Sequence, residues 1–213
     1  MVLEKEWLQR KAQFFELWPK NDLSKIELIW AILTKHYSES SRFYHTREHI
    51  LYCLNQFDQI KALLKSSNAI QMSIWFHDIV YNIEAKDNEE QSALFFSQLS
   101  KGILDEPFIR QVSELIVSTK HLTATPKCDQ AYLLDIDLSS FGSERGKFYQ
   151  NGEQLRMEAR HLTDLQFTKN QIKFFQMLLK RKQIFFTDYF HNKYENRALG
   201  NINHQMQEML CTI

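Results

Sequence analysis

The chain has 213 residues, enough for one medium domain or at most two small ones, and it carries 26 Lys and Arg against 26 Asp and Glu. This balance excludes the broad basic surface of a general nucleic-acid or anionic-membrane binder. With 5 Gly and 3 Pro the chain is too poor in turn residues for a many-stranded β fold, and 44% hydrophobic residues exclude intrinsic disorder.

Apolar residues recur at helical spacing along almost the whole chain, whereas strict alternation is rare. The sequence therefore predicts an all-α fold, with boundaries good to about 2–4 residues. The expected helices cover residues 3–18, 24–38, 46–64, 68–80, 88–101, 106–120, 129–140, 144–160, 168–182 and 188–211. The linkers between them are short, so we expect one domain over residues 1–213, with the chemically interesting motifs in about 42–201.

Helix start signals support several of these boundaries. Pro107 stands where first-turn prolines are common. Three pairs fit a capping box, in which two side chains satisfy backbone donors at a helix start. These pairs are Ser24 with Glu27, Asp87 with Glu90, and Thr168 with Gln171.

The cysteines and the N-terminus bear on cellular location. Cys53, Cys128 and Cys211 are odd in number and far apart, which is typical of reduced thiols rather than a disulfide framework or a zinc site. The first residues lack the apolar region of a secretory signal, and no window approaches the roughly 20 apolar residues of a membrane span. We therefore expect a cytoplasmic protein with no membrane partner.

Three polar clusters interrupt or adjoin apolar helices, at residues 42–49, 75–78 and 133–138. Ionisable side chains in such runs must find partners or bind a metal, because an unpaired buried charge is costly. Taken singly, His45, His49 and Asp135 are equally well explained as hydrogen-bonded residues near the core or a helix end.

Within the clusters, the spacing favours a shared site. His45 and His49 lie four residues apart, a spacing that on a helix puts both rings on one face. His77 and Asp78 offer an imidazole and a carboxylate from consecutive positions, a mixture that borderline divalent metals accept. Either Asp135 or Asp137 adds a carboxylate from an otherwise apolar run.

The order His49, His77-Asp78, Asp137 resembles the H…HD…D signature of the HD superfamily of metal-dependent phosphohydrolases. That superfamily has an all-helical fold with metal ligands from separate helices. The resemblance extends to predicted HD phosphohydrolases of unassigned substrate through six segments, FYHTREHI, WFHDIVYN, DNEEQSA, STKHL, LLDIDLSSFG and YENRAL. It implies an HD-type multi-helix bundle with a metal site between central helices.

The resemblance also implies roles for individual residues. His49, His77, Asp78 and Asp137 would be the metal ligands, and Asp135 remains a rival for the last position and a catalytic candidate. The stretch from Tyr44 to His49 is similar to the YHNxxH element of cyclic-nucleotide phosphodiesterases. This similarity makes His45 the general acid.

One position departs from the pattern. Nucleotide-hydrolysing members of the superfamily often carry a glutamate three residues after the central Asp, where this chain has Tyr81. Glu84, Asp87 or Glu90 are candidates to replace it, and helix capping is an equally good explanation for the last two.

Three basic residues are candidates for substrate contact. Lys120 and His121 end an apolar helix, where either helix capping or contact with phosphate or a second metal is possible. Arg181 is either part of a solvated helix terminus or a phosphate contact. No Gly-rich phosphate loop is found, since Ser140-Phe141-Gly142 is better explained as a helix end.

These features predict a phosphohydrolase that uses a divalent ion (Mn, Fe, Zn, Mg or Ni) on a small phosphorylated substrate, with a nucleotide favoured. The alternative is a non-catalytic HD-fold regulatory module that binds metal or nucleotide. A metal-free helical scaffold ranks third, because the clusters agree in type and order.

Overall fold

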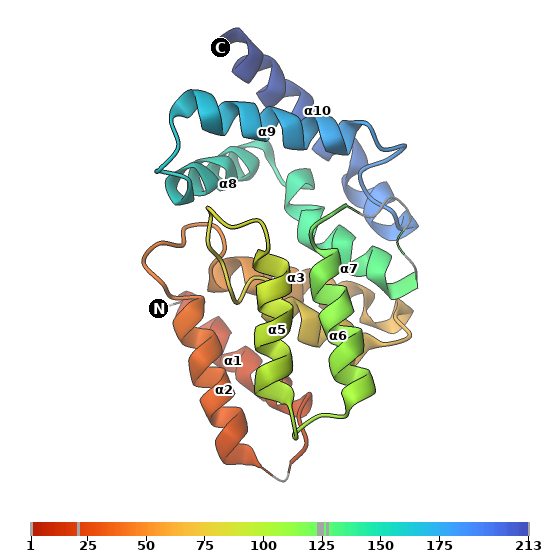
Figure 1. Cartoon of the computed structure of the whole chain (residues 1–213). Coiled ribbons are helices and arrows are strands. Elements are labelled where there is room, and N and C mark those ends of the chain that lie inside the picture. The colour runs from red at the N-terminus through yellow and green to blue at the C-terminus, as the bar shows by residue number, and fades with distance from the viewer. Residues whose placement is uncertain (1, 21, 123–125, 127, 213) are drawn as a thin grey trace. The chain divides into compact units, whose positions relative to one another are not determined.

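A computed structural model of the chain describes residues 2–20, 22–122, 126 and 128–212 (Figure 1). Within these residues the regular structure is entirely helical, which confirms the predicted all-α class. The α-helices are α1 Val2–Glu16, α2 Leu23–His36, α3 Arg47–Ile60, α4 Ser67–Phe76, α5 Asn88–Ser100, α6 Glu106–Ser118, α7 Cys128–Leu138, α8 Arg145–Glu158, α9 Asp164–Leu179 and α10 Asp188–Thr212. Two short 3₁₀ helices, η1 Lys61–Leu63 and η2 Ser139–Gly142, follow α3 and α7.

The chain divides into two compact units, residues 1–123 with α1 to α6 and residues 124–213 with α7 to α10. A single HD-type domain over 1–213 therefore stays a prediction. In the part of the chain that the structure describes, no helix is both long enough and apolar enough to cross a bilayer.

The predicted capping boxes are wrong, although the helices that they were meant to begin are present. Asp22 caps α2, where its carboxylate accepts a hydrogen bond from the Lys25 amide at 3.3 Å. Asp87 precedes α5 but makes no capping bond with its side chain. The capping box of α9 consists of Thr163 and Gln166, one turn before the predicted start. A two-residue pattern fails because it also occurs by chance inside helices. By contrast, Pro107 lies in the first turn of α6 as predicted.

An aromatic cluster fills the core of the first unit. The Trp7 ring stacks on Trp30 with centroids 5.1 Å apart, and Trp75 packs edge-on against both Trp7 and Phe14 at 5.4 Å. Trp75 belongs to α4, whose residues 69–76 are all buried. Burial of side chains this large contributes about 1.5–3 kcal/mol each, so the end of α4 is firmly placed.

In the second unit, α10 packs closely on η2. The Asn201 amide donates to the carbonyl oxygens of Phe141 and Ser143, both at 2.9 Å. A Cβ at Gly142 would lie 2.5 Å from the Cβ of Tyr194, so only glycine allows this approach. Ser140-Phe141-Gly142 is thus a helix end, as the sequence predicts.

Candidate metal centre

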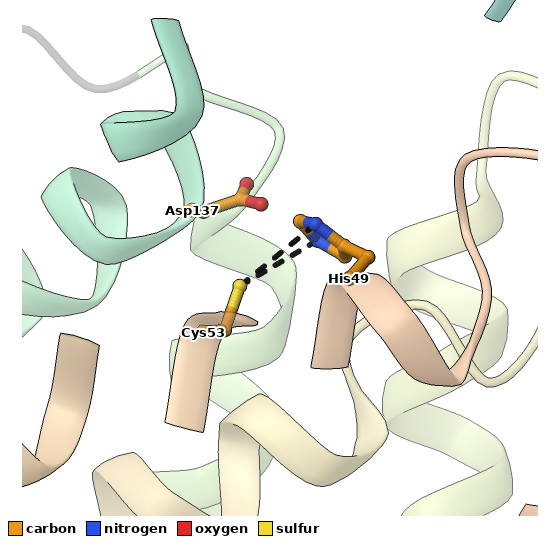
Figure 2. Close-up of side chains that lie close together, drawn as sticks. All are labelled: His49, Cys53 and Asp137. Carbon is orange, nitrogen blue, oxygen red and sulfur yellow. Dashed lines mark hydrogen bonds between the residues drawn. The ribbon is translucent and has the colours of Figure 1, made fainter. Parts of the chain in front are cut away.

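The first candidate ligand, His49, lies in the first turn of α3. The helix begins at Arg47 because Thr46 caps it, with the Thr46 hydroxyl accepting from the Glu48 amide at 3.3 Å. Cys53 follows His49 by one turn of the helix (Figure 2). Both side chains are buried. The Cys53 sulfur is 3.7 Å from Nε2 and 3.9 Å from Nδ1 of His49. Since these distances are nearly equal, the sulfur lies beside the ring rather than on the lone-pair axis of either nitrogen.

His77 and Asp78 directly follow α4, which ends at Phe76 rather than at the predicted residue 80. A turn closes the helix, with the Ile79 amide bonded to the Phe76 carbonyl oxygen at 3.2 Å. Nδ1 of His77 lies 3.0 Å from the Ile74 carbonyl oxygen. A carbonyl oxygen only accepts, so Nδ1 carries the hydrogen and Nε2 of the neutral ring carries the lone pair that a metal needs.

Three potential ligand atoms converge in the first unit. Nε2 of His49 is 3.3 Å from Nε2 of His77, and Oδ2 of Asp78 is 2.9 Å from His77 Nε2 and 3.5 Å from His49 Nε2. Ligands at about 2.1 Å from one ion, with angles of about 90–109° between them, lie about 3.0–3.4 Å apart. The spacing and the two-nitrogen, one-oxygen donor set therefore fit a borderline divalent metal, and these residues could hold one.

The charges around Asp78 also suit a cation site. The side chains of His49 and His77 are 3% exposed and that of Asp78 is 17% exposed. Burial by itself raises the pKa of Asp78, but in the metal-free chain the positive charges that His77, His45 and His49 carry when protonated, and the hydrogen bond from protonated His77, outweigh burial. The pKa of Asp78 is therefore well below its usual range, which keeps this carboxylate ionised at neutral pH.

His45 lies beside these ligands without being one of them. Its ring stacks on Tyr81 with centroids 4.0 Å apart and a 28° interplanar angle, and it is 6.0 Å from the His49 ring. Its charge acts on Asp78. The structure thus brings His45, His49, His77 and Asp78 together. The Tyr81 ring packs on one face of the His45 imidazole.

Glu89 interacts electrostatically with the ligand Asp78, which sequence reasoning missed. Burial raises the pKa of Glu89, and the negative charge of Asp78 raises it further, whereas Lys120 acts in the opposite direction. The start of α5 is anchored near the ligands because the Val80 amide donates to the Ser92 hydroxyl at 3.1 Å. The DNEEQSA segment contains this residue, but the pattern did not show which of its carboxylates interacts electrostatically with Asp78.

Lys120 and His121 follow the end of α6 at Ser118. Lys120 forms an ion pair with Glu90, in which its ammonium group donates a hydrogen bond to the carboxylate. This hydrogen bond raises the pKa of Lys120. His121 is buried and has a φ of 58°, a left-handed conformation that is uncommon for residues other than glycine. Their contact with substrate stays a prediction.

In the second unit, Asp135 on α7 has no exposed surface. Its Oδ1 accepts from the Phe186 amide at 2.8 Å, and its Oδ2 accepts from the amide and the hydroxyl of Thr187, each at 2.7 Å. This carboxylate therefore secures the segment that leads into α10.

Two other candidates lie in the same unit. The Arg181 guanidinium lies 5.3 Å from the centroid of the Phe186 ring. Burial lowers the pKa of Arg181, while the charge of Asp135 opposes the effect. Asp137 lies on α7 (Figure 2), and it is partly exposed. Roles for Asp135, Asp137 and Arg181 at the metal centre stay predictions.

Comparison of the chain with family models, curated proteins and solved structures finds no match to any of them. The interpretation of the centre therefore depends on its own chemistry and on the motif pattern.

Proposed function

We propose that the chain is an HD-type, metal-dependent phosphohydrolase that cleaves a phosphate ester or anhydride of a small metabolite, with nucleotides as the first substrate class to test. The observation that carries the proposal is the convergence of His49, His77 and Asp78 within 3.5 Å of one another. The motif pattern adds Asp137 as the fourth ligand.

His49, His77 and Asp78 would hold the ion. When bound, a divalent ion supplies a water of lowered pKa and positive charge for the phosphoryl oxygens. The chain prepares for this chemistry in two ways. The Ile74 carbonyl fixes the ring orientation of His77, and the surrounding imidazoles keep Asp78 ionised.

His45 is the proposed proton donor to the leaving oxygen. Stacking on Tyr81 restricts its ring, so the imidazole is held next to the ligands with little reorganisation. Imidazole suits this task because its protonation changes near neutral pH.

We expect His45→Ala to lower kcat by about 10²–10⁴-fold while metal content stays at the wild-type level, because general-acid catalysis has this magnitude. Steady-state kinetics and elemental analysis of the same preparations measure both quantities. His161→Ala, which removes an exposed imidazole in the second unit, is the matched control. Unchanged kcat in His45→Ala would refute the assignment of the proton donor.

Tyr81 occupies the position where nucleotide-hydrolysing members of the superfamily often carry a glutamate. Glu89 is the proposed carboxylate that orients the attacking water instead. We expect Glu89→Gln to lower turnover by about 10²-fold with metal retained, since general-base assistance is lost. Glu90→Gln is the control, because that neighbouring carboxylate pairs with Lys120 instead. Equal effects of the two variants on turnover would contradict the assignment.

A non-catalytic metal- or nucleotide-binding module is the second candidate function. Tyr81 favours it, because an aromatic ring packs on His45 where a helper carboxylate would otherwise stand. Metal binding without turnover across a broad panel of phosphate esters and anhydrides would support this alternative.

A further inference from the structure

Arg42 is a buried cation in the segment between α2 and α3. Its side chain is only 1% exposed. A guanidinium remains charged under all ordinary conditions, so burial at this level requires matched acceptors around it. The backbone acceptors that it finds belong to the segments that carry the candidate metal centre.

The guanidinium donates to three backbone carbonyl oxygens. Nη1 lies 2.6 Å from the Asp78 oxygen and 3.3 Å from the His45 oxygen, and Nη2 lies 2.9 Å from the Ile79 oxygen. Nε donates to the Glu39 carboxylate at 2.9 Å. One side chain thus connects the chain at His45 with the turn after α4.

Two aromatic rings complete the surroundings of Arg42. The guanidinium carbon is 5.3 Å from the centroid of Tyr37 and 5.7 Å from that of Tyr81. Tyr81 also stacks on His45, so Arg42 supports that imidazole through the ring as well as through the backbone. Lysine has neither the planar donor geometry nor the donor number for this arrangement.

The turn after α4 has a specific need for these donors. Asp78 and Ile79 lie beyond the end of α4, so their carbonyl oxygens have no partner within a helix and need donors from elsewhere. Arg42 donates to both carbonyl oxygens, and thereby stabilises the turn in which the Asp78 side chain lies next to His77.

We propose that Arg42 is a positioning residue that holds the His45 segment and the Asp78–Ile79 turn in one arrangement, so that the proton donor and a metal ligand face the same centre. The catalytic meaning of this role rests on the proposed function. The mechanical link between the two segments does not depend on it.

The test compares wild type with Arg42→Lys and Arg42→Gln in the full, metal-free chain. Amide hydrogen exchange should become about tenfold faster or more in residues 43–46 and 78–82 together, because charge-assisted hydrogen bonds to both are lost. Exchange in α1 and α6 should remain as in wild type.

Arg156→Lys is the matched control in the second unit. Arg156 also donates to two backbone carbonyl oxygens, of Ala159 at 2.8 Å and Leu162 at 3.1 Å, and lies 5.4 Å from the centroid of the Phe167 ring. Its replacement should leave exchange in residues 43–46 and 78–82 unchanged.

The outcomes separate this inference from the proposed function. Faster exchange in both segments, together with lowered Mn²⁺ affinity and a kcat that falls more than KM rises, supports the positioning role of Arg42 and the proposed enzymatic function. Faster exchange in a chain that never turns over phosphate compounds supports the positioning role and refutes the enzymatic one. Exchange that rises in one segment alone, rises uniformly, or stays at the wild-type rate in both variants overturns the inference, as does failure of Arg42→Lys to fold.

Discussion

Asp78→Asn is expected to weaken divalent-metal binding by at least about 100-fold and to remove turnover. Loss of a residue that only supports a ligand commonly costs about 10–100-fold in affinity, and loss of a direct ligand costs more. Asparagine keeps the size of Asp78 but removes the charge that balances the ion between His49 and His77. Isothermal titration calorimetry with Mn²⁺ or Zn²⁺ measures the affinity.

Asp58→Asn is the control for this experiment. Asp58 is a carboxylate of the same unit whose contact is an ion pair with Arg10, and its side chain is 41% exposed. Its replacement should leave metal affinity at the wild-type value. Wild-type affinity in Asp78→Asn would show that the three converging ligand atoms are only structural.

Asp135→Ala is expected to lower the free energy of unfolding by about 2–6 kcal/mol. The change leaves the amides of Phe186 and Thr187 without their acceptor, and each buried unsatisfied donor costs about 1–3 kcal/mol. Since small proteins have only about 5–15 kcal/mol of stability, the loss is a large share of the total. Urea unfolding followed by circular dichroism measures it.

Asp137→Asn tests which of the two aspartates of α7, Asp135 or Asp137, is the metal ligand. Asp137 is partly exposed whereas Asp135 is fully buried, so we expect Asp137→Asn to keep stability and to weaken metal binding. The opposite result, with metal affinity lost in a stable Asp135→Asn and retained in Asp137→Asn, would make Asp135 the ligand.

The helical architecture was predictable because apolar spacing reports directly on which face of each helix is buried. The convergence of His49 with His77 and Asp78 was predictable for a related reason, since polar side chains in apolar runs need partners. α4 illustrates the limit. Its apolar pattern continues past Phe76, yet the helix ends there in a turn whose carbonyl oxygens bond to Arg42.

Glu89 and Arg42 escaped prediction because their surroundings come from distant segments. The sequence around Glu89 and Glu90 does not show which of the two carboxylates the charge of Asp78 affects. The answer depends on how α5 is held against Val80. Arg42 likewise resembles any loop arginine until the turn at Asp78 is placed next to it. Tertiary contacts of this kind have no signature in spacing or composition.

The most direct test of the central claim is the metal content of wild-type chain purified without chelator or affinity metal and then offered Mn²⁺, Fe²⁺ or Zn²⁺. Elemental analysis should find stoichiometric divalent metal in the wild type and little in Asp78→Asn, and the loaded protein should hydrolyse a phosphate ester or anhydride. A wild type that takes up none of these ions would contradict the account.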